Sequence, residues 1–147
     1  FWMESKGRLG RKAKAGFFSY DAQGKRLGYW EGLSAQYPLT AQQPDLIDVQ
    51  HRLIFVQSLE AVRALEEGVL MDIREGDVGA ILGWGFAPWS GGPFSWLDIL
   101  GSPYAAERCD QLHHAYGDRF ACPDLLRSMA SKGQSFYGQA KKAQSAA

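Results

Sequence analysis

Apolar side chains recur every three or four residues through one long stretch of the chain, and this spacing predicts an α-helix. The stretch runs from Asp45 to Glu67 without a Gly or Pro, while Pro44 precedes it and Gly68 follows it. A proline before a helix and a glycine after it are common boundary residues. Because apolar residues cover most of its circumference, we expect this helix to be the buried centre of a helical domain.

Glycines and prolines divide the following residues into four shorter predicted helices. We expect them over residues 72–82, 94–100, 102–116 and 123–133, each starting at a capping residue or Pro and ending near a Gly. Residues 83–92 combine Gly with aromatic side chains and are expected to be irregular. Five helices with short connections predict an all-α domain over residues 45–137, built around the long central helix.

The residues before this domain differ from it in charge. Lys plus Arg and Asp plus Glu are balanced at 16 each over the whole chain, but residues 1–33 hold seven basic residues and three acidic ones. We expect residues 1–33 to form an irregular basic arm containing a short hairpin. Residues 34–44 are expected to be a polar linker, and residues 138–147 a frayed tail.

The basic arm is a candidate phosphate-binding segment. Arg8, Arg11 and Lys12 are its candidate contacts, with phosphate supplied by a nucleotide, by CoA or by nucleic acid. A solvated loop, or one that neutralises the acidic residues beyond it, is the alternative interpretation. No aromatic residue is interleaved within the basic run, so nucleic acid is not an expected partner.

Five aromatic residues gather within thirteen positions, from Trp84 to Trp96. Two interpretations stay open. The aromatic side chains could form a docking surface for a partner or an acyl chain, or they could fill the core where two helices meet. The candidate interface residues are Phe86, Trp89, Phe94 and Trp96.

The chain lacks the patterns of a complete active site. His51 lies within the long helix, where a structural role is expected, and the adjacent His113 and His114 point to different faces, so no metal site is expected. Cys109 and Cys122 have no metal or redox spacing and are expected to be reduced thiols. Dinucleotide-binding, Walker and nucleophile-elbow motifs are absent, and no apolar run approaches the ~18 residues of a membrane span.

Two segments resemble a known enzyme family. Gly7–Tyr20, GRLGRKAKAGFFSY, looks like the end of the C-terminal domain of NAD-dependent 3-hydroxyacyl-CoA dehydrogenases. Residues 48–137 look like the second, degenerate copy of that domain in the α-subunit of bacterial fatty-acid oxidation complexes. The landmarks of this second segment are Arg52-Leu53, Glu60-Ala61, Arg63, Glu66-Glu67-Gly68, Asp77, Gly79, Gly83, Phe86, Pro88, Gly92-Pro93-Phe94 and Leu97-Asp98.

The resemblance implies a helical domain of the dehydrogenase C-terminal type, within a longer cytoplasmic protein of fatty-acid β-oxidation. NAD and the catalytic pair of that family belong to a Rossmann domain, and no position of this chain matches them, so we expect NAD in the parent protein and no cofactor on this chain. The catalytic copy of the domain has a substrate-facing Asn where this chain has His51. No catalytic residue is therefore carried over.

Two functional hypotheses follow. In the first, the chain is a fragment whose partners are the preceding helical repeat and the Rossmann domain of the parent dehydrogenase. In the second, it is a stand-alone helical interaction module without catalytic activity, which pairs with a second copy of itself or docks a separate dehydrogenase subunit. The first residues begin without Met and read like the interior of a protein, which favours the fragment.

Overall fold

The computed structural model describes residues 2–138, which divide into two compact units on either side of the Pro44–Asp45 bond. We call residues 2–44 the N-terminal unit and residues 45–138 the C-terminal unit. The predicted frayed tail lies outside the described residues except for Gly138.

The N-terminal unit is a small hairpin flanked by short helical turns. Its elements are α1 (Trp2–Ser5), the 3-10 helix η1 (Arg11–Ala13), β1 (Phe18–Tyr20), β2 (Arg26–Tyr29) and α2 (Gly32–Gln36). The two strands pair antiparallel, which confirms the predicted hairpin. The Asp21 carboxylate fixes the turn between them by accepting hydrogen bonds from the backbone N–H groups of Gln23 (3.0 Å) and Lys25 (2.8 Å). Helix α2 overlaps the start of the predicted linker.

The C-terminal unit is all-α, as predicted. Its elements are α3 (Leu46–Glu66), α4 (Ile73–Trp84), the 3-10 helix η2 (Pro88–Ser90), α5 (Pro93–Leu100), α6 (Ser102–Tyr116), the 3-10 helix η3 (Asp118–Phe120) and α7 (Asp124–Lys132). The five α-helices named here, between residues 46 and 132, correspond to the five predicted ones. The irregular stretch expected over residues 83–92 is shorter than predicted, because α4 continues through Trp84 and η2 forms within it.

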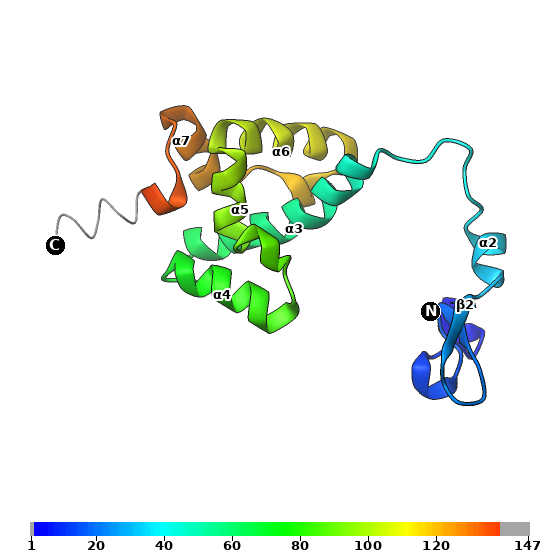
Figure 1. Cartoon of the computed structure of the whole chain (residues 1–147). Helices are drawn as coiled ribbons and strands as arrows, with labels where there is room; N and C mark the ends of the chain where they lie inside the picture. The colour runs from blue at the N-terminus through cyan, green and yellow to red at the C-terminus, as the bar shows by residue number, and fades with distance from the viewer. Residues whose placement is uncertain (1, 139–147) are drawn as a thin grey trace. The chain divides into compact units, whose positions relative to one another are not determined.

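Helix α5 connects the layers of the C-terminal unit. It packs against α3, α4 and α6, and α6 in turn packs against α7. Figure 1 shows α4 and α6 on opposite sides of α5, with the long α3 running behind it. The fully buried side chains contributed by these helices include Phe55, Leu59, Val62, Ala80, Phe94, Ala105, Cys109 and Leu126.

Helix α3 is buried along one side only. Asp45 caps its start by accepting hydrogen bonds from the backbone N–H groups of Ile47 (2.7 Å) and Asp48 (3.2 Å). Phe55 and Leu59 face the core, whereas the apolar side chains of Ile47 and Leu53 are exposed. The expectation of burial around most of the circumference is therefore wrong for the first half of α3, where few other elements cover the helix.

Candidate functional site

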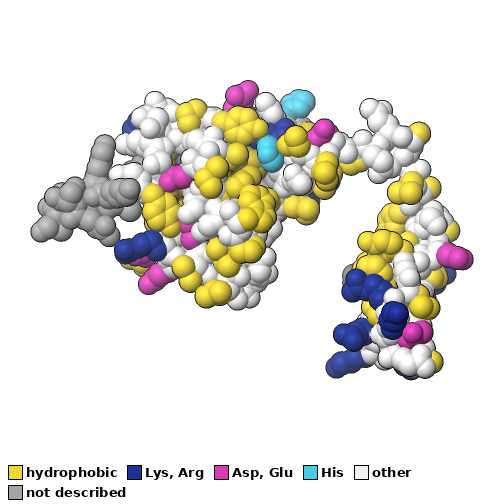
Figure 2. Space-filling model, viewed as in Figure 1, with side chains coloured by type: hydrophobic (Ala, Val, Ile, Leu, Met, Phe, Trp, Pro, Cys, Tyr) yellow, Lys and Arg dark blue, Asp and Glu magenta, His cyan; other side chains and the backbone are white. Residues whose placement is uncertain are grey.

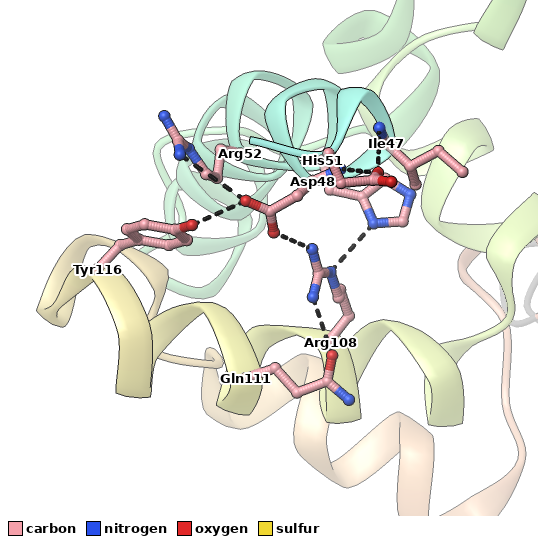
Figure 3. Close-up of polar contacts among 8 residues, drawn as sticks. Ile47, Asp48, His51, Arg52, Arg108, Gln111 and Tyr116 are labelled. Carbon is pink, nitrogen blue, oxygen red and sulfur yellow. Dashed lines mark hydrogen bonds and ion pairs between the residues drawn. The ribbon is translucent and has the colours of Figure 1, made fainter. Parts of the chain in front are cut away.

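A polar network joins the first turns of α3 to α6, and Figure 3 shows its members converging. Asp48 is its centre. The carboxylate accepts hydrogen bonds from the Tyr116 hydroxyl (2.8 Å) and from an Arg108 Nη (2.5 Å), and it lies 3.7 Å from an Arg52 Nη. The Tyr116 hydrogen bond, together with Arg108 and Arg52, lowers the pKa of Asp48 below its ordinary value, although burial acts in the opposite direction.

His51 belongs to the same network but does not have the environment of a catalytic base. Its Nδ1 accepts a hydrogen bond from the Nε–H of Arg108 (3.1 Å), which occupies that nitrogen. Burial, and secondly the positive charge of Arg108, lower the pKa of His51 below its ordinary value. The ring also packs edge-on against Phe55 (5.6 Å between centroids) and Trp96 (6.2 Å). The neutral imidazole therefore links α3 to α5 and α6.

A hollow of about 350 Å³ lies beside this network. It is lined by Arg52, Leu53, Val56, Tyr116, Arg119 and Phe120. The lining supplies cations, a phenol and apolar walls, but none of its residues is a Cys, Ser, Asp or Glu that could act as a nucleophile or carboxylate base. Chemically this hollow offers cationic and apolar contacts to a molecule that enters it.

Two carboxylates, one buried and one half-buried, hold α5 in place. Neither of them was assigned a structural role from the sequence. Asp77 of α4 is 2% exposed and accepts hydrogen bonds from the backbone N–H groups of Phe94 (2.8 Å) and Ser95 (3.1 Å) at the start of α5. Asp98, near the end of α5, accepts hydrogen bonds from the N–H groups of Phe136 (2.8 Å) and Tyr137 (2.9 Å). The only sequence signal was their presence among the landmarks of the resemblance.

The four candidate interface residues have different environments. Phe86, Phe94 and Trp96 are buried within the C-terminal unit, so their rings serve its own core. Trp89, on η2, is 74% exposed and is the one of the four that is available to a partner. Of the two interpretations of the aromatic stretch, core filling thus applies to three residues, and docking stays a prediction for Trp89.

One side of α4 is apolar and uncovered. Val78 is 56% exposed and Leu82 is 81% exposed, and Figure 2 shows hydrophobic side chains on the visible surface over this helix. Gly79 and Gly83 lie beside them, and a Cβ added to either glycine would meet no atom within 4 Å. We call Val78, Gly79, Leu82 and Gly83 the α4 face.

The three candidate phosphate contacts also differ in their surroundings. Arg8 is used inside the N-terminal unit, where its Nε donates to the carbonyl of Gly16 (2.8 Å) and its guanidinium stacks 4.3 Å from the Trp30 ring centroid. Arg11 and Lys12 lie on η1 and are exposed. Phosphate binding by these cations stays a prediction.

Metal-ligand clusters, disulfide bonds and membrane-spanning helices are all absent from the described residues. Between residues 2 and 138, no group of three or more His, Cys, Asp or Glu side chains could hold a metal ion. Cys109 and Cys122 are free thiols, and the neighbouring Cys122 together with burial raises the pKa of Cys109. Within the same residues, every helix is too short or too polar to cross a bilayer.

Taken together, the fold and its contacts define an all-α unit whose helices are joined by buried and half-buried polar clusters. No protein-family model matches the chain. The chain is 40% identical over 131 residues to the fatty acid oxidation complex subunit alpha of Shewanella loihica, an alignment that covers 88% of this chain and 19% of the relative. It is 37% identical over 135 residues to the protein of the same name from Vibrio vulnificus, covering 89% of the chain and 18% of the relative.

The chain therefore matches a segment of fatty acid oxidation complex α-subunits and spans about a fifth of their length. The resemblance inferred from the sequence to this subunit is confirmed.

Proposed function

We propose that this chain is a non-catalytic, bracing segment of a fatty acid oxidation complex α-subunit. The subunit's activity would be NAD-dependent oxidation of 3-hydroxyacyl-CoA during β-oxidation in the cytoplasm. NAD supplies the hydride acceptor, and a Rossmann domain elsewhere in the subunit would bind it. The segment's contribution would be to pack against the preceding helical repeat and keep the substrate cleft in shape.

The observation that carries this proposal is the uncovered α4 face. An apolar face of this kind on a helix is suited to a second helix, because the two glycines let another backbone approach closely between Val78 and Leu82. The relatives are about five times as long as the matched segment, so most of such a subunit lies outside this chain. The proposed occupant is accordingly another helical unit of the same subunit.

Trp89 extends the proposed contact beyond α4. Exposed tryptophans are frequent binding hot spots, and truncating one typically costs about 2 kcal/mol or more, which corresponds to roughly thirtyfold in affinity. Trp96 provides the contrast, since it is 5% exposed and contacts the Phe55 ring at 4.9 Å between centroids. Trp89→Ala should weaken partner binding without unfolding the unit, whereas Trp96→Ala should destabilise the unit itself by about 3–5 kcal/mol.

The packing role can be tested in a chimaera. The matched segment of the Shewanella loihica α-subunit is replaced by this chain, and Leu82→Glu is introduced into the α4 face. We expect the charge to lower both thermal stability and dehydrogenase rate, because a carboxylate would be buried without a partner. Ile99→Glu is the matched control, as Ile99 is also exposed but lies on α5. Equal behaviour of the two variants would contradict packing through α4.

The non-catalytic role is tested on the isolated chain. NADH titration followed by fluorescence and an absorbance assay with acetoacetyl-CoA should give no binding and no turnover above buffer. Measurable turnover would overturn this part of the proposal. Light scattering distinguishes the remaining candidate occupant, because a concentration-dependent dimer that Leu82→Glu disrupts would assign the α4 face to a second copy of the chain.

A further inference from the structure

The cations of the N-terminal unit fall into two groups according to what they contact. Arg8 donates to the carbonyls of Gly16 and Phe18, and Lys14 Nζ donates to the carbonyl of Ala22 at 2.5 Å. These two side chains hold the loop together through these hydrogen bonds. The remaining cations are exposed, and among them the Arg26 guanidinium stacks 4.0 Å from the Phe18 ring centroid, which fixes its position and leaves its N–H edge available. Figure 2 shows Lys and Arg side chains gathered on the visible surface of this unit.

Three of the exposed cations surround one hollow of about 400 Å³. Arg11 reaches it from η1, Lys25 from the hairpin turn and Arg26 from the start of β2, which pairs with Tyr20. Tyr20 and Gly24 complete the lining. The antiparallel hairpin thus brings together residues that are up to fifteen positions apart in the sequence.

No carboxylate neutralises these cations within the lining as described. The nearest acidic residue along the chain, Asp21, directs Oδ1 at the backbone N–H groups of Gln23 and Lys25, so that oxygen is occupied by the turn. Like charges around a small hollow repel one another, and an anion bound between them relieves that repulsion. The tyrosine hydroxyl is a further hydrogen-bond donor.

The size and charge of the hollow specify the kind of anion. Guanidinium groups bind phosphoryl oxygens through paired N–H donors, and Lys adds a point charge. Three cations exceed what a single carboxylate can satisfy, and the volume falls within the range of small-molecule sites. We propose that the hollow formed by Arg11, Tyr20, Lys25 and Arg26 binds the diphosphate group of a small molecule. This site is independent of the packing role of the C-terminal unit.

The test is calorimetric titration of the full chain with inorganic diphosphate at low ionic strength. The double variant Arg11→Gln with Lys25→Gln removes two lining charges and should weaken binding about tenfold or more. The double variant Lys6→Gln with Lys12→Gln removes the same charge from the same unit outside this lining and should retain the wild-type affinity. Equal losses of diphosphate affinity in the two double variants would overturn the proposed site, because they would show that the net positive charge of the unit attracts the anion without a defined site.

Two further measurements use the wild-type chain, so their result does not depend on whether the variants fold. In the wild-type chain, diphosphate should shift the backbone amide resonances of Gly24 and Lys25, which line the hollow, more than the amide resonance of Lys14, which follows η1 and does not line it. A nucleoside diphosphate that binds more tightly than inorganic diphosphate would place the ligand among nucleotides, whereas equal affinity would assign the site to the diphosphate group alone. Absence of binding to either probe at millimolar concentration, or shifts confined to other residues, would refute the proposal.

Discussion

Asp77 makes a buried polar contact that joins two helices of the C-terminal unit. Its carboxylate reaches from α4 to the start of α5, where it accepts hydrogen bonds from the N–H groups of Phe94 and Ser95 and from the Ser95 hydroxyl (2.6 Å). The Tyr137 hydroxyl donates a fourth hydrogen bond at 2.9 Å. Gly92, the N-cap residue of α5, has no side chain that could cap the helix, so Asp77 does so from a distance.

The cost of removing this carboxylate follows from those contacts. Losing a helix cap costs about 1 kcal/mol, and each buried donor left without an acceptor costs about 1–3 kcal/mol. Asp77→Ala should therefore lower the free energy of unfolding by about 4 kcal/mol, a large part of the 5–15 kcal/mol of a typical domain. Asp77→Asn keeps one acceptor oxygen but turns an NH₂ group toward donors, and it should cost about half as much.

Urea unfolding followed by far-UV circular dichroism measures these differences. With a slope near 2 kcal/mol/M, Asp77→Ala should lower the unfolding midpoint by about 2 M. Glu75→Ala is the matched control, because Glu75 is an exposed acid on the same helix, and its loss should change stability by less than about 1 kcal/mol. A change below 1 kcal/mol for Asp77→Ala, with the Phe94 amide still protected from hydrogen exchange, would refute the reasoning.

Three further predictions concern single residues. Tyr116→Phe removes the main cause of the lowered pKa of Asp48, so carboxyl NMR titration should show that the pKa of Asp48 rises. A carboxyl whose pKa is lowered by folding stabilises the fold above its unfolded-state pKa, near 3.8, and this stabilisation is lost as the pH falls through the folded-state pKa. The variant should therefore also lose less stability on acidification. The pKa of His51 is lowered in the fold, so the wild type should lose stability as the pH falls below about 6.5, and His51→Asn should reduce that loss in pH-dependent melts. Gly92 has φ 114°, and an added Cβ would lie 2.5 Å from the Asp77 carboxyl carbon, so Gly92→Ala should cost at least about 2 kcal/mol in the same urea assay.

Local signals were sufficient to predict most helix boundaries. Pro44 and Gly68 were the predicted boundary residues of α3, and the helix does lie between them, with Gly68 at φ 71° after its end. The hairpin was also predictable, because Asp21 and Gly24 suit a tight turn between two apolar pieces. These signals are read within a few residues of the position that they determine.

The candidate sites could be predicted only in part. Trp89 and Trp96 belong to the same aromatic stretch, yet one is exposed and the other is buried against Phe55. Hydrophobicity does not distinguish them, since each element has a side that faces the core and a side that does not. In the basic arm, composition identified Arg11 as a candidate but gave no indication that Arg8 would be used by its own loop.

The sequence by itself determined where the helices begin and end, that the C-terminal unit is all-α, and which protein the chain resembles, because caps, breakers and apolar spacing act over one or two turns. Only the tertiary structure decided that Asp77 caps a helix seventeen residues away and that Arg26 joins Arg11 at one hollow. Such contacts depend on how separate elements pack, and packing is set by the whole set of buried surfaces rather than by any one segment.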